Sequence, residues 1–413
     1  MIEYKSLKKE LKSIVQERID FRRDFTDEEV SDIIDEVILE SEEMRFLPVS
    51  KRKTIHNEIF DSLRRLDILQ TFVDDPSVTE IMINGMDNIF VEKNGKLIKL
   101  AQQFESAEKL RDVIQQIVAG CNRVVNESSP IVDARLANGS RVNIVMNPVA
   151  LNGPIVTIRR FPDKPITMDR LIALGSITKE AAGFLQILVK AKYNIFISGG
   201  TGSGKTTFLN VLSSFIPKDE RIITIEDSAE LQLIGIDNLV RLETRNGNAE
   251  GCTEISIRDL IKSSLRMRPD RLVVGEIRGA EAIDMLQCMN TGHDGSMSTG
   301  HANSARDMLS RIENMVLMGA PLPLDAIKQQ IASGIDIIVH LGRLRDKSRK
   351  VLDISEVLGF ENGEIKTEVL YKFVEKGSNL EGTIRGKLEK QNKISRSDKL
   401  QSAGLSKSEI EAL

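Results

Sequence analysis

Residues 195–207 read Ile-Phe-Ile-Ser-Gly-Gly-Thr-Gly-Ser-Gly-Lys-Thr-Thr. A short apolar run stops at Ser198, glycines follow between residues 199 and 204, and a helix-like run opens at Lys205. The spacing fits G-x-x-x-x-G-K-[ST], in which backbone N–H groups of a loop and of a helix N-terminus surround phosphate oxygens. The sequence therefore predicts a site for ATP between a strand and a helix.

Nine consecutive residues are expected to hold the triphosphate: Gly199, Gly200, Thr201, Gly202, Ser203, Gly204, Lys205, Thr206 and Thr207. Lys205 is expected to reach the β- and γ-phosphates, and the Thr206 hydroxyl to bind Mg²⁺, an ion that favours oxygen ligands. The alternative is a glycine-rich turn that binds nothing. The strand-like run before the loop and the helix-like run after it favour the nucleotide site.

Length, charge and cysteine content narrow the class of protein. A chain of 413 residues has room for two or three domains. Lys and Arg (57) nearly balance Asp and Glu (61), which argues against a protein that coats nucleic acid. The three cysteines are widely spaced without a C-x-x-C pair, as expected in the reducing cytoplasm. No apolar run approaches the ~20 residues of a membrane span, so we expect a partner to hold the protein at any membrane.

The spacing of apolar residues and turn signals differs between parts of the chain. Apolar residues recur at helical spacing in the charged N-terminal stretch, and turn signals such as Asn84-Gly85 and Asn138-Gly139 separate short strand-like runs further on. We expect five parts: a helical N-terminal region (1–70), a mixed α/β domain (71–162), a linker (163–166), a P-loop domain (167–360) and a polar C-terminal tail (361–413).

The P-loop domain alternates strand-like and helix-like runs. Strands are expected at 194–198, 222–226, 271–275 and 296–299, with helices between them. Such alternation with short links predicts a parallel sheet covered on both faces, that is, an α/β fold with a RecA-like core. Ser256-x-x-Asp259 and Ser304-x-x-Asp307 resemble capping boxes and mark two helix starts. Two further strands after Gly334 predict an antiparallel end to the sheet.

Acidic residues follow two of these strands. Glu276 ends the run Arg271–Gly275, at the edge of the sheet where ligands of such folds bind, and Gly275 occupies the place where many P-loop enzymes have an Asp. Glu276 is therefore the candidate for orienting the metal's water shell and the attacking water, with a buried structural acid as the alternative. Glu230 is the second candidate. For Glu226 and Asp227 the alternative is that they cap the next turn and have no catalytic role.

Two of the four histidines, His293 and His301, flank the fourth expected strand, 296–299. His301 stands at the end of this strand, where it could donate a hydrogen bond to the γ-phosphate and respond to its loss after hydrolysis. A zinc pair is not expected there, because no cysteine or third histidine lies at ligand spacing.

Four stretches in this order, GGTGSGKTT, TIEDSAEL, RPDRLVVGEIRG and TGHDGSMSTGHA, resemble the Walker A, Asp box, Walker B and His box of the type II/IV secretion ATPases. Upstream, DDPSVTEIMINGMDNIFVEKNGKL, DARLANGSRVN and TIRRF are similar to the N-terminal domain of the CpaF-type ATPases that power Tad/Flp pili. The resemblance implies a cytoplasmic homohexameric ATPase that sits against an inner-membrane platform protein and moves pilin subunits.

The same resemblance implies roles for individual residues. Glu276 is then the main catalytic acid, Glu230 one of the Asp-box acids and His301 a His-box residue. Arg135 and Arg141 match arginines that the preceding domain offers to the phosphates. A two-residue loop at Asn138-Gly139 would place these arginines on opposite faces of their hairpin, whereas a three-residue loop, 138–140, would place them on one face.

Two other functions remain open at this level. A nucleic-acid motor would use the basic stretch Arg343 to Lys350 as its contact, but such motors often stack bases on aromatic side chains, and this chain has no Trp and three Tyr. Nucleic acid is therefore an unlikely partner. A regulatory P-loop module would bind the nucleotide without hydrolysing it, and its acidic residues would have no catalytic role.

Overall fold

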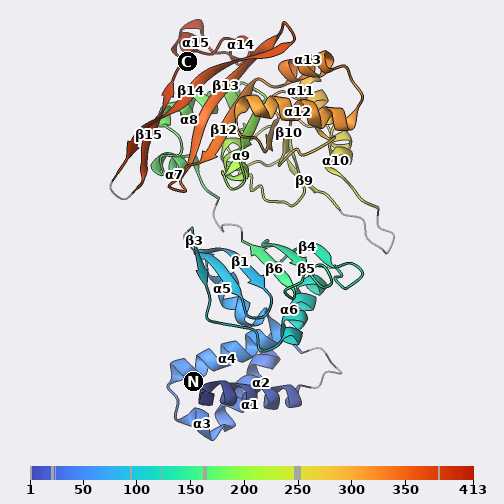
Figure 1. Cartoon of the computed structure of the whole chain (residues 1–413), viewed down its shortest axis with the longest axis vertical. Coiled ribbons are helices and arrows are strands. Elements are labelled where there is room, and N and C mark those ends of the chain that lie inside the picture. The colour runs from blue at the N-terminus through green and yellow to red at the C-terminus, as the bar shows by residue number, and fades with distance from the viewer. Residues whose placement is uncertain are drawn as a thin grey trace. The chain divides into compact units, whose positions relative to one another are not determined.

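The computed structural model describes residues 2–19, 23, 25–93, 95–121, 123–160, 165–245, 253–379 and 382–413. The chain forms two compact units, residues 1–163 and 164–413 (Figure 1). The linker expected at 163–166 lies partly outside the described residues, since residues 163 and 164 are not among them.

The first unit begins with helices packed around a small core of their own. Their bounds are α1 (Ile2–Arg18), α2 (Asp27–Glu40), α3 (Glu42–Arg45), α4 (Val49–Arg64), the 3₁₀ turn η1 (Asp67–Leu69) and α5 (Gln70–Asp74). Ile34 of α2 and Ile55 and Ile59 of α4 are fully buried in this core, as their helical spacing predicts. Thr26 and Glu29 form a capping box that starts α2.

An antiparallel six-stranded sheet follows in the same unit. Its strands are β1 (Val78–Asn84), β2 (Ile89–Lys93), β3 (Lys96–Lys99), β4 (Ile131–Arg135), β5 (Arg141–Val145) and β6 (Ile155–Arg159), in the order β3-β2-β1-β6-β5-β4. Helix α6 (Ala107–Gly120) packs its apolar stripe against the sheet through Leu110, Ile114 and Ile117. Residues 78–159 thus combine short strands with a helix, as the turn signals predict, and they belong to the same unit as the N-terminal helices.

The second unit is built on a nine-stranded sheet. Its strands are β7 (Ile195–Gly199), β8 (Ile222–Glu226), β9 (Leu239–Glu243), β10 (Arg271–Val274), β11 (Met297–Gly300), β12 (Ile337–Arg343), β13 (Arg349–Glu361), β14 (Glu364–Ser378) and β15 (Ile384–Lys390). The order is β15-β14-β13-β12-β7-β11-β10-β8-β9. In this spatial order, neighbouring strands from β12 through β7, β11, β10 and β8 to β9 are parallel, and neighbouring strands from β12 to β15 are antiparallel. Strand β9, at the parallel edge, was not predicted.

Helices cover both faces of this sheet. They are α7 (Met168–Ala173), α8 (Lys179–Lys190), α9 (Lys205–Ser213), α10 (Ile257–Ser264), α11 (Ala282–Asn290), α12 (Ala305–Gly319) and α13 (Leu324–Gly334) (Figure 1). Side chains alternate across β7, so that Ile195 and Ile197 pack with α8 and α9, while Phe196 packs with α10 to α13. Each face therefore has its own core, which confirms the predicted α/β P-loop fold.

The C-terminal stretch differs from the polar tail expected at 361–413. It forms β14 and β15 and then two short helices, α14 (Asp398–Ser402) and α15 (Lys407–Ala412). Leu388, Ile394 and Leu400 join the core of the α8 and α9 face. The prediction was wrong because a few widely spaced apolar residues anchor the segment, although its overall composition is polar.

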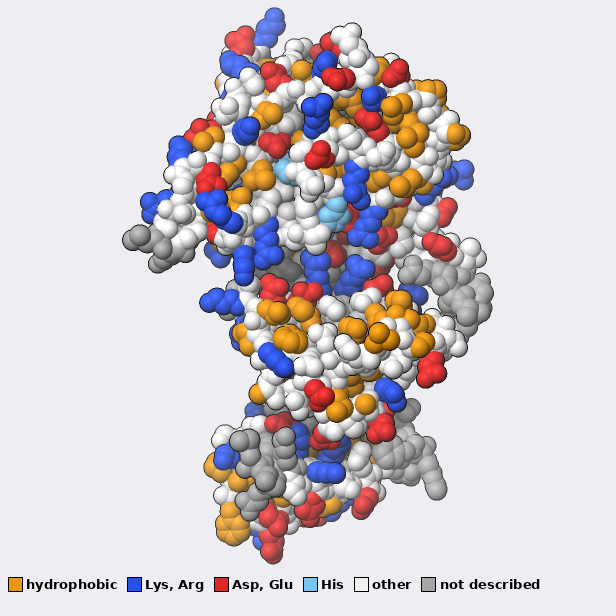
Figure 2. Space-filling view, viewed as in Figure 1, with side chains coloured by type: hydrophobic (Ala, Val, Ile, Leu, Met, Phe, Trp, Pro, Cys, Tyr) orange, Lys and Arg blue, Asp and Glu red, His pale blue; other side chains and the backbone are white. Residues whose placement is uncertain are grey.

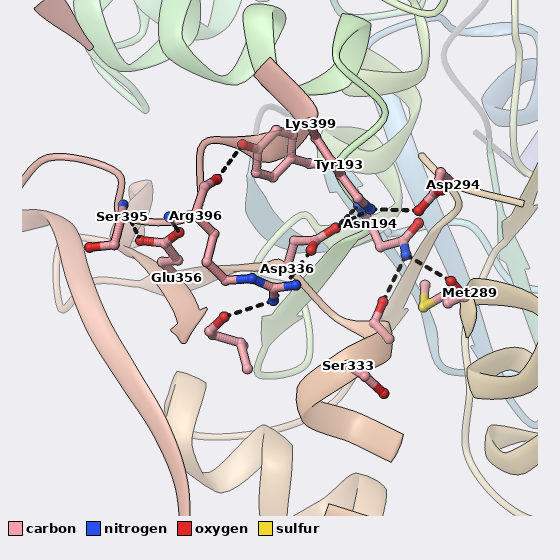
Figure 3. Close-up of polar contacts among 12 residues, drawn as sticks. Tyr193, Asn194, Met289, Asp294, Ser333, Asp336, Glu356, Ser395, Arg396 and Lys399 are labelled. Atoms are coloured by element: carbon pink, nitrogen blue, oxygen red, sulfur yellow. Dashed lines mark hydrogen bonds and ion pairs between the residues drawn. The ribbon is translucent and has the colours of Figure 1, made fainter. Parts of the chain in front are cut away.

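Polar contacts also fasten this segment to the start of the central strands (Figure 3). The carboxylate of Asp336 is only 3% exposed and accepts hydrogen bonds from Asn194 N at 2.8 Å and Lys399 Nζ at 2.7 Å. The carboxylate of Glu356 accepts from the backbone N–H groups of Ser395 and Arg396. We call these four side chains and three N–H groups the C-terminal clasp: the side chains of Asp336, Glu356, Arg396 and Lys399, with the backbone N–H groups of Asn194, Ser395 and Arg396.

Among the described helices, none is both long and apolar enough to cross a lipid bilayer.

Candidate active site

The predicted phosphate-binding loop lies between β7 and α9. Strand β7 ends at Gly199, and α9 begins at Lys205 with Gly204 as its N-cap. Gly204 has a φ of +95°, a conformation that side-chain-bearing residues rarely adopt, which explains the glycine before the lysine. The loop thus presents the free N–H groups of the first turn of α9 at the carboxyl end of a central parallel strand.

Lys205, His301 and Glu276 form one row across three neighbouring strands. Lys205 follows β7, His301 follows β11 and Glu276 follows β10 by two residues, and the sheet order places β11 between the other two. Lys205 Nζ lies 3.1 Å from His301 Nδ1, and His301 Nε2 lies 2.9 Å from Glu276 Oε1. The structure therefore brings together three residues that were singled out from separate motifs.

His301 lies between a cation and an acid. An ammonium group can only donate, so His301 accepts from Lys205 Nζ, which lies 3.1 Å from Nδ1 and 3.5 Å from Nε2, while Nε2 also lies 2.9 Å from Glu276 Oε1. Burial lowers the pKa of His301, and the charges of Lys205, Arg278 and Arg311 act in the same direction, against the opposing effect of Glu276. The imidazole is thus neutral at neutral pH and links the lysine of the P-loop to the candidate catalytic acid.

Arg278 is a site residue that sequence reasoning missed. Its Nε lies 2.9 Å and its Nη2 2.5 Å from Glu276 Oε2, and its Nη1 lies 3.4 Å from Asp227 Oδ2. The two oxygens of Glu276 therefore face different residues, His301 and Arg278. An arginine two residues after the acid, in Gly275-Glu-Ile-Arg278, was the only signal available from the sequence.

Glu226 fills the space beside Gly275. It is 3% exposed, and its Oε1 accepts hydrogen bonds of 2.9 Å from the backbone N–H groups of Glu230 and Leu231, so it caps the following turn. A Cβ on residue 275 would lie 3.0 Å from Glu226 Cγ, which explains why a glycine precedes Glu276. Burial is the main cause that raises the pKa of Glu226 to about 7.

Glu230, the second candidate acid, is half-buried. Its backbone N–H is bound to Glu226, and its charge raises the pKa of Arg278, which places it near the Arg278 guanidinium. No hydrogen bond of its side chain is present among the described residues. Glu230 therefore lies at the edge of the row formed by Lys205, His301 and Glu276.

The donor set suits a magnesium ion that arrives with a nucleotide. Among the described residues, no three His, Cys, Asp or Glu side chains form a ready-made metal cage. Mg²⁺ in such sites usually takes one or two protein oxygens, with the rest of its shell from phosphates and water. The Thr206 hydroxyl in the first turn of α9 and the carboxylate of Glu276 are the oxygens that fit this pattern.

Arg135 and Arg141 lie in the first unit, at the end of the β4–β5 hairpin. They are directly opposite each other in the ladder, so both are on one face, as a three-residue loop requires. The loop comprises residues 137–139, however, and not the predicted 138–140, because Leu136 N donates to Ser140 O. Arg141 Nη2 lies 3.6 Å from Asp133 Oδ1, and Arg135 Nε donates to Gly139 O at 3.3 Å. Their role toward a nucleotide stays a prediction.

The sequence profile of a protein family described as "Type II/IV secretion system protein" matches residues 63–388. The chain belongs to this family. A putative conjugal transfer protein of Mycobacterium tuberculosis is 32% identical over 312 residues, which cover 74% of this chain and 87% of the relative. The probable conjugal transfer protein TrbB of Sinorhizobium fredii is 33% identical over 306 residues, covering 73% of this chain and 90% of that protein.

Two solved structures share the fold of this chain. The ATPase DotB of Legionella pneumophila superposes with a TM-score of 0.50 at 20% identity, over 71% of this chain and 80% of DotB. The pilus retraction motor PilT, solved with bound ADP, gives a TM-score of 0.51 at 16% identity, over 84% of this chain and 99% of PilT. At these identities the likeness supports the fold, and the activity is argued from the site.

Proposed function

We propose that this type II/IV secretion protein hydrolyses ATP, with Mg²⁺, to drive the assembly of a Tad/Flp-type pilus or a related secretion step. The observation that carries the proposal is the row of Lys205, His301 and Glu276 at the carboxyl ends of adjacent parallel strands. Ligands of open α/β sheets bind at this edge. A cation for the phosphates and an acid for the water therefore stand where a triphosphate would enter.

Each residue has a distinct task in this proposal. The loop 199–207 binds the phosphates through its N–H groups, and Lys205 neutralises charge on the β- and γ-phosphates. Mg²⁺, when bound, supplies positive charge to the phosphate oxygens. Glu276 orients and polarises the attacking water, while Arg278 and His301 hold its carboxylate in place.

ATP binding would rearrange the row. Lys205 is bonded to His301 Nδ1 and to Gly200 O, and it must turn toward the phosphates to act on them. His301 then loses the donor on Nδ1 and becomes able to respond to the γ-phosphate. The link between loop and acid is therefore suited to report whether the site holds ATP or ADP.

Family membership supports the larger role. The chain shares the fold of a protein named as a pilus retraction motor, and the motifs of residues 72–161 resemble those of CpaF-type ATPases. We infer a homohexamer on the cytoplasmic face of the inner membrane, held there by a polytopic platform protein. Neighbouring genes for a pilin and such a platform protein would support this assignment.

A motor for conjugal transfer is the second candidate, because two relatives that are 32% and 33% identical to this chain carry that description. One assay separates the candidates: ATP hydrolysis by the purified full chain with Mg²⁺, with and without single-stranded DNA. A pilus or secretion motor hydrolyses ATP at a rate that DNA leaves unchanged. Strong stimulation by DNA would favour a nucleic-acid motor, and tight ATP binding without hydrolysis would indicate a regulatory module.

A further inference from the structure

The turn between β12 and β13 carries an unusual excess of positive charge. Its basic residues are Arg343, Arg345, Lys347, Arg349 and Lys350. Glu375 pairs with Arg345 of this set, and Asp346 accepts hydrogen bonds from Ser348 and from Ile384 N. In the space-filling view, Lys and Arg side chains gather along the rim of the C-terminal unit near α9 (Figure 2).

Two of these cations face each other. Arg343 and Arg349 are direct partners in the antiparallel ladder of β12 and β13. Like charges at directly opposed positions destabilise a sheet. Among the described residues, neither arginine forms an ion pair with an acid that would offset this cost. An arrangement of this kind favours an anionic ligand.

The same two residues lie against the phosphate-binding loop. Strand β12 is the parallel neighbour of β7, so the turn after β12 and the loop after β7 are at one edge of the sheet. Arg349 Nε donates a 2.8 Å hydrogen bond to Gly202 O. Arg343 Nη1 lies 4.0 Å from the position that a Cβ on residue 202 would take.

The bond from Arg349 fixes the orientation of one loop peptide. A trans peptide is planar, so its C=O and N–H point in opposite directions. Because Gly202 O accepts from Arg349, the N–H of Ser203 points away from Arg349 and makes a long 3.3 Å bond to Gly200 O within the loop. Inward N–H groups are what a P-loop offers to phosphate oxygens.

We propose that Arg349 is a positioning residue of the nucleotide site, which holds the 202–203 peptide with its N–H toward the phosphates. The proposal deepens the proposed function and rests on it. Arg343 adds positive potential beside the loop without a bond to it. Arg349 and Arg343 thereby belong to the nucleotide site, whereas Arg345 is paired with Glu375 and does not. A nucleic-acid contact at this turn is disfavoured, because Arg349 is already bound to the loop.

The test measures binding of a fluorescent ATP analogue and of ADP to the full chain and its variants. Arg349→Ala is expected to raise the Kd for both nucleotides about tenfold, the effect of losing a hydrogen bond from a charged donor. Arg349→Lys should recover part of the affinity, because the ammonium keeps the charge and a donor. Free guanidinium at millimolar concentration should rescue Arg349→Ala, which a loss of folded protein would not permit.

Two matched variants distinguish the effect of the hydrogen bond from Arg349 from the effect of positive charge in the turn. Arg345→Ala removes a cation from the same turn that pairs with Glu375, and its Kd should equal that of the wild type. Arg343→Ala removes the opposed cation and should weaken binding less than Arg349→Ala, with an effect that disappears at high salt.

The outcome that overturns the inference is an Arg349→Ala variant that binds as tightly as Arg345→Ala, or one that guanidinium does not rescue. Failure of the wild type to bind either nucleotide would instead refute the proposed function itself. Thermal unfolding of each variant shows whether the comparison is made on folded protein.

Discussion

His301 Nε2 lies 2.9 Å from Glu276 Oε1, while the other ring nitrogen of His301 accepts from Lys205. A neutral imidazole thus connects the cation that contacts phosphates to the acid that acts on water. Because Arg278 holds the second oxygen of Glu276, the carboxylate is fixed from two sides before any nucleotide binds. Preorganised groups of this kind need little rearrangement during reaction, which is how positioned charges accelerate chemistry.

Glu276→Gln should therefore retain nucleotide binding and lose hydrolysis. The amide is nearly the same size but carries no charge, so it cannot polarise the attacking water. We expect turnover to fall by about two orders of magnitude or more. Binding and phosphate release should be measured on one preparation, with Glu230→Gln as the comparison. Should Glu276→Gln keep more than half of the wild-type rate, the catalytic role would pass to Glu230.

Lys205→Ala should abolish tight nucleotide binding. The substitution removes the charge expected to face the β- and γ-phosphates, and it leaves His301 Nδ1 without its donor. Equilibrium titration with a labelled ATP analogue checks this, and circular dichroism shows whether the variant is folded. A wild-type affinity would refute the assignment of the loop.

Glu226 should make the stability of the second unit depend on pH. Its folded-state pKa is about 7, above the value of 4.5 in an unfolded chain, because its carboxyl group is buried. Between these values the folded state keeps a proton that the unfolded state releases, so stability falls as the pH rises from 4.5 to 7. This loss of unfolding free energy is complete above pH 7 and amounts to about 3 kcal/mol.

Glu226→Gln tests this, because the amide stays neutral and can still accept the N–H bonds of Glu230 and Leu231. Urea unfolding at pH 5 and pH 8 should show that the variant loses less stability than the wild type between the two values. Equal losses in both proteins would mean that Glu226 is ionised throughout.

Local pattern was sufficient to predict the P-loop core. The strands that carry the site are runs of buried β-branched residues followed at once by the functional groups, so Ile222–Glu226 and Arg271–Val274 lie where the sequence places them. The box Ser256-x-x-Asp259 forms reciprocal hydrogen bonds. Such features can be predicted from local sequence, because the residues that form them lie within a few positions of one another.

Features that depend on distant partners were missed. The contact from Arg349 to Gly202 joins residues 147 positions apart, and Lys399 meets Asp336 across 63 positions. Arg278 is close to Glu276 in sequence, yet only the fold turns its guanidinium toward the carboxylate. The C-terminal segment was taken for a tail for the same reason, since its polar residues find buried partners only after the sheet has formed.

The C-terminal clasp should contribute to the stability of the second unit. Lys399→Met keeps the length and the apolar stem but removes the charge that neutralises the buried carboxylate of Asp336 (Figure 3). Removing one partner of a buried ion pair costs about 3–5 kcal/mol, and the bond from Asn194 N together with Arg396 Nη1, which lies 3.5 Å from Asp336 Oδ1, reduces this to about 2 kcal/mol. Chemical denaturation measures the change. Lys407→Met on α15 is the control, and an equal effect of both substitutions would contradict the role of the clasp.

Arg135 and Arg141 are expected to act on the triphosphate as cations that balance charge developing on the γ-phosphoryl oxygens. The described hairpin meets one requirement of this prediction, since both arginines are on one face at its end. Asp133 Oδ1 lies 3.6 Å from Arg141 Nη2, so Arg141 has an acidic neighbour within the hairpin.

Replacing either arginine by Ala should therefore reduce hydrolysis far more than nucleotide binding, while the oligomer still assembles. Removing a group that acts mainly in the transition state lowers kcat with little change in affinity, whereas removing a scaffold residue would leave both kcat and affinity unchanged. Single-turnover hydrolysis, equilibrium binding and size-exclusion chromatography on the same preparations distinguish these cases. Arg123→Ala, in the same domain but outside the hairpin, is the matched control. If both hairpin variants hydrolyse ATP at the wild-type rate, the hairpin is scaffold, and Arg159 and Arg160 at the end of β6 become the next arginines to replace.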